Sequence, residues 1–114
     1  MTLNRERLRQ SAGDDPELER ELGAEFANAL PALMERFASA GREGALDRLR
    51  SAAHCLKGSS RTLGLERVAA ACERIEADAA TGAGDNSAAL IVELRARCEE
   101  AAAALQAIVM ERAP

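Results

Sequence analysis

The sequence has no tryptophan and no tyrosine, and phenylalanine occurs only at Phe26 and Phe37. Alanine, leucine, glutamate and arginine are abundant instead, a composition that favours helices over sheets. No apolar run approaches the roughly 18 residues of a membrane-spanning helix, and the chain does not open with the segments of a secretion signal. We therefore expect an all-α protein that is soluble, cytoplasmic and without a membrane partner.

The three cysteines do not form a disulfide or metal-binding pattern. An odd count without a secretion signal argues against a disulfide framework. Cys55, Cys72 and Cys98 lie 17 and 26 residues apart in a chain with one histidine, which disfavours a metal site. Cys55 and His54 point about 100° apart on a helix, so they do not form a nucleophile–base pair. We expect Cys72 and Cys98 to be small core residues.

The charge of the chain is uneven. The formal net charge of −4 disfavours a nucleic-acid partner. Residues 42–67 nevertheless contain six basic and three acidic residues, so this segment carries +3 and the remainder carries −7. A basic region on an acidic protein suggests an acidic partner surface, although so short a window can also be basic by chance.

The first half of the chain predicts a short helix and a long one. Residues 2–10 are compatible with a short helix capped by Thr2. Asp15-Pro16-Glu17 is a typical helix start, and the helix that follows is expected to reach about residue 39, ending at Gly41. Pro31 lies inside it, so one bent helix or two short helices meeting at Leu30 are both possible. The expected inward residues are Leu18, Leu22, Phe26, Ala29, Leu33 and Phe37.

Three further helices are expected over residues 44–63, over 65–80, and from the loop at 81–87 to about residue 111. Gly64 follows the first of these, where a left-handed residue often ends a helix, and Asp85 or Ser87 can cap the last. The inward residues are predicted to be Leu46, Leu49, Ala53, Leu56, Ser60 and Leu63, then Leu65, Val68, Cys72, Ile75 and Ala79, then Ile91, Leu94, Cys98, Ala101, Leu105 and Ile108.

At 114 residues the chain has the length of one domain, which we assign to residues 1–114. Amphipathic helices with short connections predict an antiparallel up-down four-helix bundle with a possible short extra helix at the N-terminus. We expect this bundle to be a monomer.

The helix over 44–63 has a polar face around His54, the only histidine. Lys57, Gly58 and Arg61 share this face. A glycine inside a helix costs about 1 kcal/mol relative to alanine, and Gly58 leaves space one turn beyond the imidazole. A histidine with free space and a cation beside it suits an anionic group such as phosphate. The spacing alone is also compatible with an ordinary surface histidine beside a tolerated glycine.

The segment Ala53-His54-Cys55-Leu56-Lys57-Gly58-Ser59-Ser60, followed by Leu63-Gly64, resembles the signature of the histidine-containing phosphotransfer (Hpt) domain of two-component phosphorelays. The family pattern is Ala-His-x-Leu-Lys-Gly, then small residues, then Leu-Gly. The resemblance covers about residues 15–110, because the segment from Leu65 to Glu76 is also similar to the family's next helix. Arg42-Glu43 departs from the family, which often has a capping aspartate or asparagine there.

The resemblance implies that His54 is the phosphorylated residue. His54 would accept a phosphoryl group from an aspartyl phosphate on one receiver domain and pass it to an aspartate on another. Lys57 can neutralise the phosphoryl oxygens, and Gly58 lets the partner approach. The family leaves the position of Arg61 variable, so we expect Arg61 and Arg50 to help dock the partner because they belong to the basic segment 42–67.

The same resemblance implies a phosphocarrier without catalysis of its own. The expected partners are response-regulator receiver domains and a hybrid sensor histidine kinase. We expect no bound cofactor and no metal in this chain, with Mg²⁺ supplied by the receiver. Two other functions stay open: a helical adaptor or dimerisation bundle without chemistry, and a phosphoacceptor module that a separate histidine kinase loads from ATP.

Overall fold

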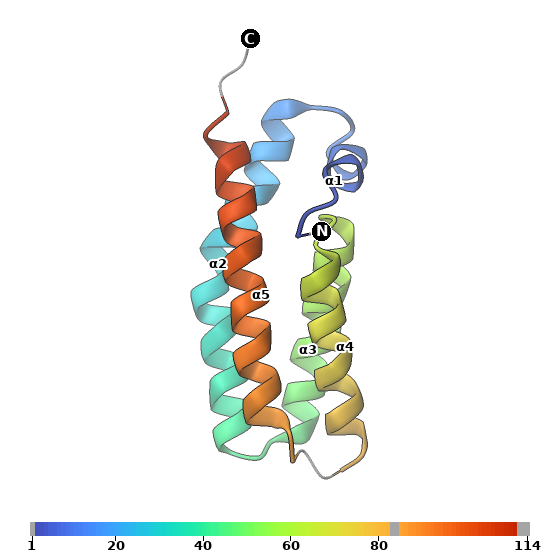
Figure 1. Ribbon diagram of the computed structural model, residues 1–114, viewed down its shortest axis with the longest axis vertical. Helices are drawn as coiled ribbons and strands as arrows, with labels where there is room; N and C mark the ends of the chain where they lie inside the picture. The colour runs from blue at the N-terminus through green and yellow to red at the C-terminus, as the bar shows by residue number, and fades with distance from the viewer. Residues whose placement is uncertain (1, 83–84, 112–114) are drawn as a thin grey trace.

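The computed structural model describes residues 2–82 and 85–111, and this part of the chain contains five α-helices and no strand. The helices are α1 (Arg5–Ser11), α2 (Pro16–Arg42), α3 (Leu46–Thr62), α4 (Glu66–Ala80) and α5 (Ser87–Val109). Helices α2 to α5 run alternately down and up, and α1 lies across one end of them (Figure 1). The predicted all-α up-down bundle with an extra N-terminal helix is confirmed. Within the described residues, no helix combines the length and apolarity needed to span a membrane.

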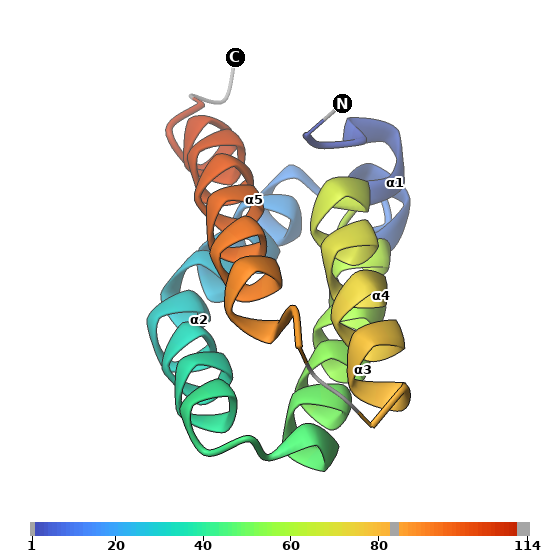
Figure 2. The ribbon, with the colours of Figure 1, turned by 60° about the horizontal axis from the view of Figure 1, so that its bottom comes forward.

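The bundle consists of two tightly packed helix pairs. Helix α3 packs most extensively against α4, and α2 packs most extensively against α5, while contacts between α2 and α3 are fewer. Figure 2 shows the two pairs side by side. The site helix, α3, is therefore held mainly by α4, and its border with α2 is more open.

The predicted inward residues of α3, α4 and α5 are confirmed, with Leu46 only partly buried against the core. The prediction for α2 is partly wrong, since Leu18 is 37 % exposed and Ala29 is also exposed. The face of α2 that packs against its main partner, α5, is rotated slightly from the predicted face. The buried residues on that line are Gly23, Phe26, Leu30, Met34, Phe37 and Ala40.

Helix α2 begins as predicted but ends later. The Asp15 side chain accepts hydrogen bonds from the backbone N–H groups of Glu17 and Leu18, at 2.9 and 3.4 Å. The helix continues through Pro31, so the alternative of two short helices is wrong. It also continues past Gly41, where a β-carbon would press on Ile91 of α5 at 2.9 Å. The left-handed turn comes instead at Gly44, with a φ of 63°.

Two predicted caps are wrong. The Asn4 side chain, not Thr2, accepts the capping hydrogen bond of α1, from the N–H of Arg7. Helix α5 follows Asn86 without a side-chain cap. Asp78 of α4 accepts hydrogen bonds from Asn86 and Ser87, so Ser87 is used to join the loop to α4. Of the predicted loop, residues 83 and 84 lie outside the described residues.

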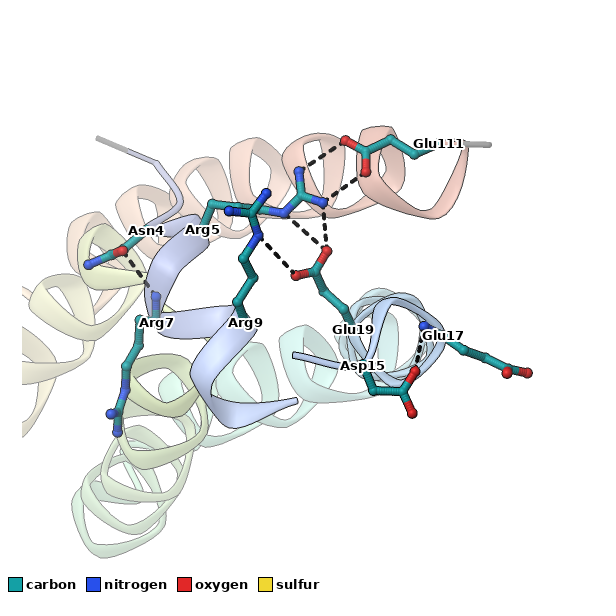
Figure 3. Close-up of polar contacts among 8 residues, drawn as sticks. All are labelled: Asn4, Arg5, Arg7, Arg9, Asp15, Glu17, Glu19 and Glu111. Carbon is teal, nitrogen blue, oxygen red and sulfur yellow. Dashed lines mark hydrogen bonds and ion pairs between the residues drawn. The ribbon is translucent and has the colours of Figure 1, made fainter. Parts of the chain in front are cut away.

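An ion-pair cluster holds α1 on the end of the bundle (Figure 3). The Arg5 guanidinium lies between Glu19 of α2, at 2.6 Å, and Glu111, at 2.8 Å. Glu19 is only 5 % exposed, and a carboxylate so buried requires a cation beside it. Arg5 thereby joins α1 to α2 and to the residues that follow α5.

The N-terminal segment also contacts the turn after α3. Gly64 has a φ of 78°, as expected for the residue that follows the helix, and its carbonyl accepts a 2.7 Å hydrogen bond from the N–H of Asn4. A β-carbon at Gly64 would collide with the Asn4 carbonyl oxygen. The turn that ends the site helix is therefore held by the N-terminal segment.

Candidate functional site

Helix α3 presents His54 to solvent because its apolar residues occupy the opposite side. Leu49, Ala53 and Leu56 are buried, whereas the His54 side chain is 73 % exposed. His54 lies near the middle of α3, as predicted. A rigid helix thus holds the imidazole in a position that a second protein can reach.

Glu76 of α4 is the acidic neighbour of His54. Its Oε2 lies 3.5 Å from Nδ1 of His54, a separation too long for a good hydrogen bond but within ion-pair range. A carboxylate beside Nδ1 favours the tautomer with its proton on that nitrogen. This leaves the lone pair on Nε2, which is the nitrogen available to an incoming group.

Glu76 also binds Lys57. The Lys57 Nζ lies 2.8 Å from Oε1 of Glu76, and both side chains are mostly buried, at 18 % and 20 % exposed. Burial raises the pKa of Glu76, but the hydrogen bond and charge of Lys57, with a smaller contribution from His54, outweigh it and lower the pKa. Glu76 is therefore ionised at neutral pH, and it is in ion-pair range of both Lys57 and His54.

Glu76 is the site residue that the sequence reasoning did not assign. Twenty-two residues separate it from His54, so no short motif contains both. The antiparallel pairing of α3 and α4 about Gly64 gives the relevant clue. His54 and Glu76 lie 10 and 12 residues from that turn, so the two helices bring them side by side.

Gly58 faces open space. No atom lies within 4 Å of the position of its missing β-carbon, whereas Gly23 and Gly41 are crowded by residues of α5. Packing within the described residues therefore gives no reason for a glycine at position 58. This open position one turn from His54 is compatible with the predicted clearance for a partner.

The basic segment 42–67 is largely neutralised in three dimensions. Five of its six basic side chains form ion pairs with carboxylates, four of which lie outside the segment. The pairs are Arg42–Glu35, Arg48–Glu43, Lys57–Glu76, Arg61–Glu73 and Arg67–Glu100. Arg61, predicted to contact a partner, is thus already paired with α4.

Arg50 is the exception. It is exposed, and among the described residues no carboxylate lies within ion-pair distance of it. Arg50 lies one turn before His54 on the same face of α3. The two residues line a shallow surface depression together with Asp47, Ser51, Lys57 and Glu76.

An apolar groove of about 490 Å³ runs along the other side of His54, between α2 and α3. Leu22, Phe26, Ala29 and Leu33 of α2 form one wall, and Cys55, Leu56, Ser59 and Leu63 are among the residues opposite. Cys55, the exposed residue next to His54 in the sequence, lines this groove, whereas His54 itself does not. Leu22 and Leu33, which are only partly buried against the core, and the exposed Ala29 thus offer apolar surface along this groove.

No metal site accompanies the histidine in the described part of the chain. Residues 2–82 and 85–111 contain no group of three or more His, Cys, Asp or Glu side chains that could hold a metal ion. Cys72 and Cys98 are buried, as predicted, and burial raises the pKa of each thiol to about 12. The charged and polar side chains that concern the site are His54, the Glu76–Lys57 pair and Arg50.

An up-down bundle that displays a single histidine on one helix has the architecture of a histidine phosphotransfer module. The chain belongs to the Hpt domain family, which it matches over residues 21–107. Hpt domains are phosphocarrier modules of phosphorelays rather than catalysts, and they interact with receiver domains and hybrid kinases. The resemblance inferred from the segment around His54 is confirmed.

Two solved structures have the same fold. The histidine-containing phosphotransfer protein B (HptB) of Pseudomonas aeruginosa PAO1 has a TM-score of 0.88 and 21 % identity, covering 97 % of each chain. The Hpt domain of a sensor hybrid histidine kinase from Shewanella has a TM-score of 0.82 and 20 % identity, covering 99 % of this chain and 97 % of that one. No curated protein matches the sequence.

Proposed function

We propose that this protein receives a phosphoryl group on His54 from the aspartyl phosphate of one receiver domain and passes it to an aspartate of another. The observation that carries the proposal is the orientation of His54 in an Hpt-family bundle. Its Nδ1 faces Glu76, and its ring is exposed to solvent. Phosphoryl transfer depends on in-line positioning and charge stabilisation, which an exposed, oriented imidazole can supply.

The chemical step follows from the tautomer. The Nε2 lone pair attacks phosphorus, the P–O bond to the receiver's aspartyl carboxylate breaks, and that carboxylate leaves. The ring becomes a phosphoimidazolium that keeps its proton on Nδ1, where the charge of Glu76 stabilises it. In the return step a carboxylate of the second receiver attacks phosphorus, the P–N bond breaks, and neutral imidazole is restored. Lys57 holds Glu76 beside the ring in both directions, and its own charge reaches the phosphoryl oxygens largely offset by that carboxylate.

The receiver supplies Mg²⁺ and docks over the open side of α3. Gly58 leaves room for it beside the histidine, and the apolar groove between α2 and α3 offers contact area next to Cys55. Arg61 contributes to receiver docking at the edge of this contact through its positive charge, which Glu73 partly offsets. On this proposal the protein is a carrier, and phosphohistidine forms only when a partner presents its aspartyl phosphate.

The test uses receiver domains phosphorylated with acetyl phosphate in the presence of Mg²⁺. Wild type should gain an acid-labile, alkali-stable phosphoryl group, and His54→Gln should gain none while keeping its helical circular dichroism and melting temperature. Label on the folded His54→Gln variant would contradict the assignment. Wild type that takes no label from any receiver, yet is labelled by a histidine kinase with ATP, would indicate a kinase-loaded acceptor instead.

A further inference from the structure

The charges around His54 are balanced only while the histidine is unphosphorylated. Asp47, Arg50, Lys57 and Glu76 line the depression beside the ring, and their formal charges sum to zero. A phosphoryl group adds up to two negative charges, and the positive charge of the protonated ring offsets only one of them. The phosphorylated state therefore needs a cation whose charge is not already balanced.

Lys57 does not meet this need alone. Its ammonium group lies 2.8 Å from Glu76, and the two side chains are mostly buried together. Because Glu76 also faces Nδ1 of His54, the carboxylate remains in place when the ring carries a phosphoryl group. The Lys57–Glu76 pair therefore brings almost no net charge to the phosphoryl oxygens, and Arg61 is paired with Glu73.

Within the described part of the chain, Arg50 carries an unpaired positive charge close to His54. It has no carboxylate partner among the described residues and lines the same depression as His54. Arg50 precedes His54 by four residues, so the two side chains lie one turn apart on the same face of α3. A guanidinium also matches two phosphoryl oxygens at once, in a way that an ammonium group does not.

We propose that Arg50 binds the phosphoryl group of phosphorylated His54 and so sets how much phosphate the protein holds at equilibrium with a receiver. This inference rests on the proposed function, and it assigns Arg50 to the phosphoryl group rather than only to partner docking. The two roles differ measurably. A docking residue changes forward and reverse transfer rates alike, whereas a phosphoryl-binding residue stabilises one side of the reaction.

The experiment measures the equilibrium constant for phosphoryl exchange with one receiver, at protein concentrations too low for stable complexes. Arg50→Gln should lower the constant about fivefold, the effect of one exposed charge at about 4 Å. Arg50→Lys should stay within about twofold of wild type, because the charge is kept. Arg95→Gln is the matched control, since it removes an exposed arginine from α5, which does not pack against α3, and it should have no effect.

An unchanged equilibrium constant in Arg50→Gln, with both rates reduced equally, would overturn the proposal and make Arg50 a docking residue. An equal drop in Arg95→Gln would also overturn it, because the effect would then reflect net charge alone.

A second measurement does not depend on any receiver. Phosphoramidate can phosphorylate His54 directly: Nε2 bonds to phosphorus, the P–N bond of phosphoramidate breaks and ammonia leaves. The ³¹P resonance of the product should move in Arg50→Gln and stay in place in Arg95→Gln. Identical ³¹P spectra for wild type and Arg50→Gln would overturn the role of Arg50. A clear ³¹P difference without exchange with any receiver would instead contradict the proposed function and leave the role of Arg50 intact.

Discussion

At the scale of single residues, the site depends on one carboxylate that serves two neighbours. Glu76 lies 3.5 Å from Nδ1 of His54 and 2.8 Å from Nζ of Lys57. One side chain of α4 thus orients the ring and restrains the lysine of α3. Such a residue positions the reacting group without touching the phosphoryl group itself.

Glu76→Gln should slow phosphorylation of His54 roughly five- to tenfold, because it removes the charge that stabilises the developing imidazolium. The rate should be measured with phosphoramidate, so that receiver docking plays no part. Glu73→Gln is the control, since it removes an exposed carboxylate one turn earlier on α4, paired with Arg61. Equal rates for Glu76→Gln and Glu73→Gln would show that the contact at Nδ1 has no effect on reactivity.

Within helix α3, the exposed residue Gly58 makes the helix less stable than it could be. Gly58 lies inside the helix with open space beyond it, although alanine or leucine would stabilise the helix by up to about 1 kcal/mol. Gly23 and Gly41 of α2 differ, because each allows close approach to α5. Among the three glycines inside the helices of the described residues, only Gly58, beside the histidine, is not required by packing.

Gly58→Leu should raise the melting temperature by roughly 3–5 °C and reduce transfer from a phosphorylated receiver at least tenfold, because the side chain occupies the approach to His54. Gly58→Ala should give a similar rise in melting temperature with a smaller loss of transfer. Thermal melts and transfer rates on the same preparations provide the comparison. If Gly58→Leu transferred phosphate as fast as wild type, Gly58 would not be needed to leave room for the receiver.

Across the whole molecule, ion pairs join consecutive helices and also join the two ends of the chain. Lys57–Glu76 connects α3 to α4, and Arg74–Glu93 connects α4 to α5. Arg5 connects α1 to both Glu19 and Glu111 (Figure 3). The fold therefore depends on carboxylates being ionised, in addition to its apolar core.

The pH dependence of stability follows from the depressed pKa values. Burial opposes ionisation of Glu76, but Lys57 lowers its pKa, and a hydrogen bond from Arg5 lowers the pKa of Glu111. Such groups contribute stability above the unfolded pKa of about 4.3, and this stability is lost as the pH falls through the lower, folded values. The melting temperature should be flat from about pH 8 to 5 and decline below about pH 4.

Circular dichroism melts between pH 3 and 8 test this dependence. Arg5→Gln should melt at a lower temperature at pH 7, because the buried Glu19 loses its closest cation, and its melting temperature should depend less on pH in the acidic range. A melting temperature that rises on acidification from pH 5 to pH 3 would contradict the assignment.

The helices, the core of α3 to α5 and the exposed position of His54 could all be predicted from the amino-acid sequence. These features depend on local periodicity, on glycine geometry and on a short motif, all of which are readable within a few turns of helix. The burial pattern of α2 was not determined in this way. Leu18 and Ala29 fall on an apolar line, but α2 turns toward α5, and only tertiary packing decides which line is buried.

The electrostatics of the site could not be predicted from the sequence. The positive charge of residues 42–67 is largely balanced, because carboxylates from α2, α4 and α5 form ion pairs with this segment. Glu76 reached His54 because the antiparallel pairing about Gly64 places the two side by side. Ion pairs depend on distances in space, which counting charges along the chain cannot give. For the same reason the sequence could not show that Arg50, alone among the basic residues of this segment, has no carboxylate partner in the described part of the chain.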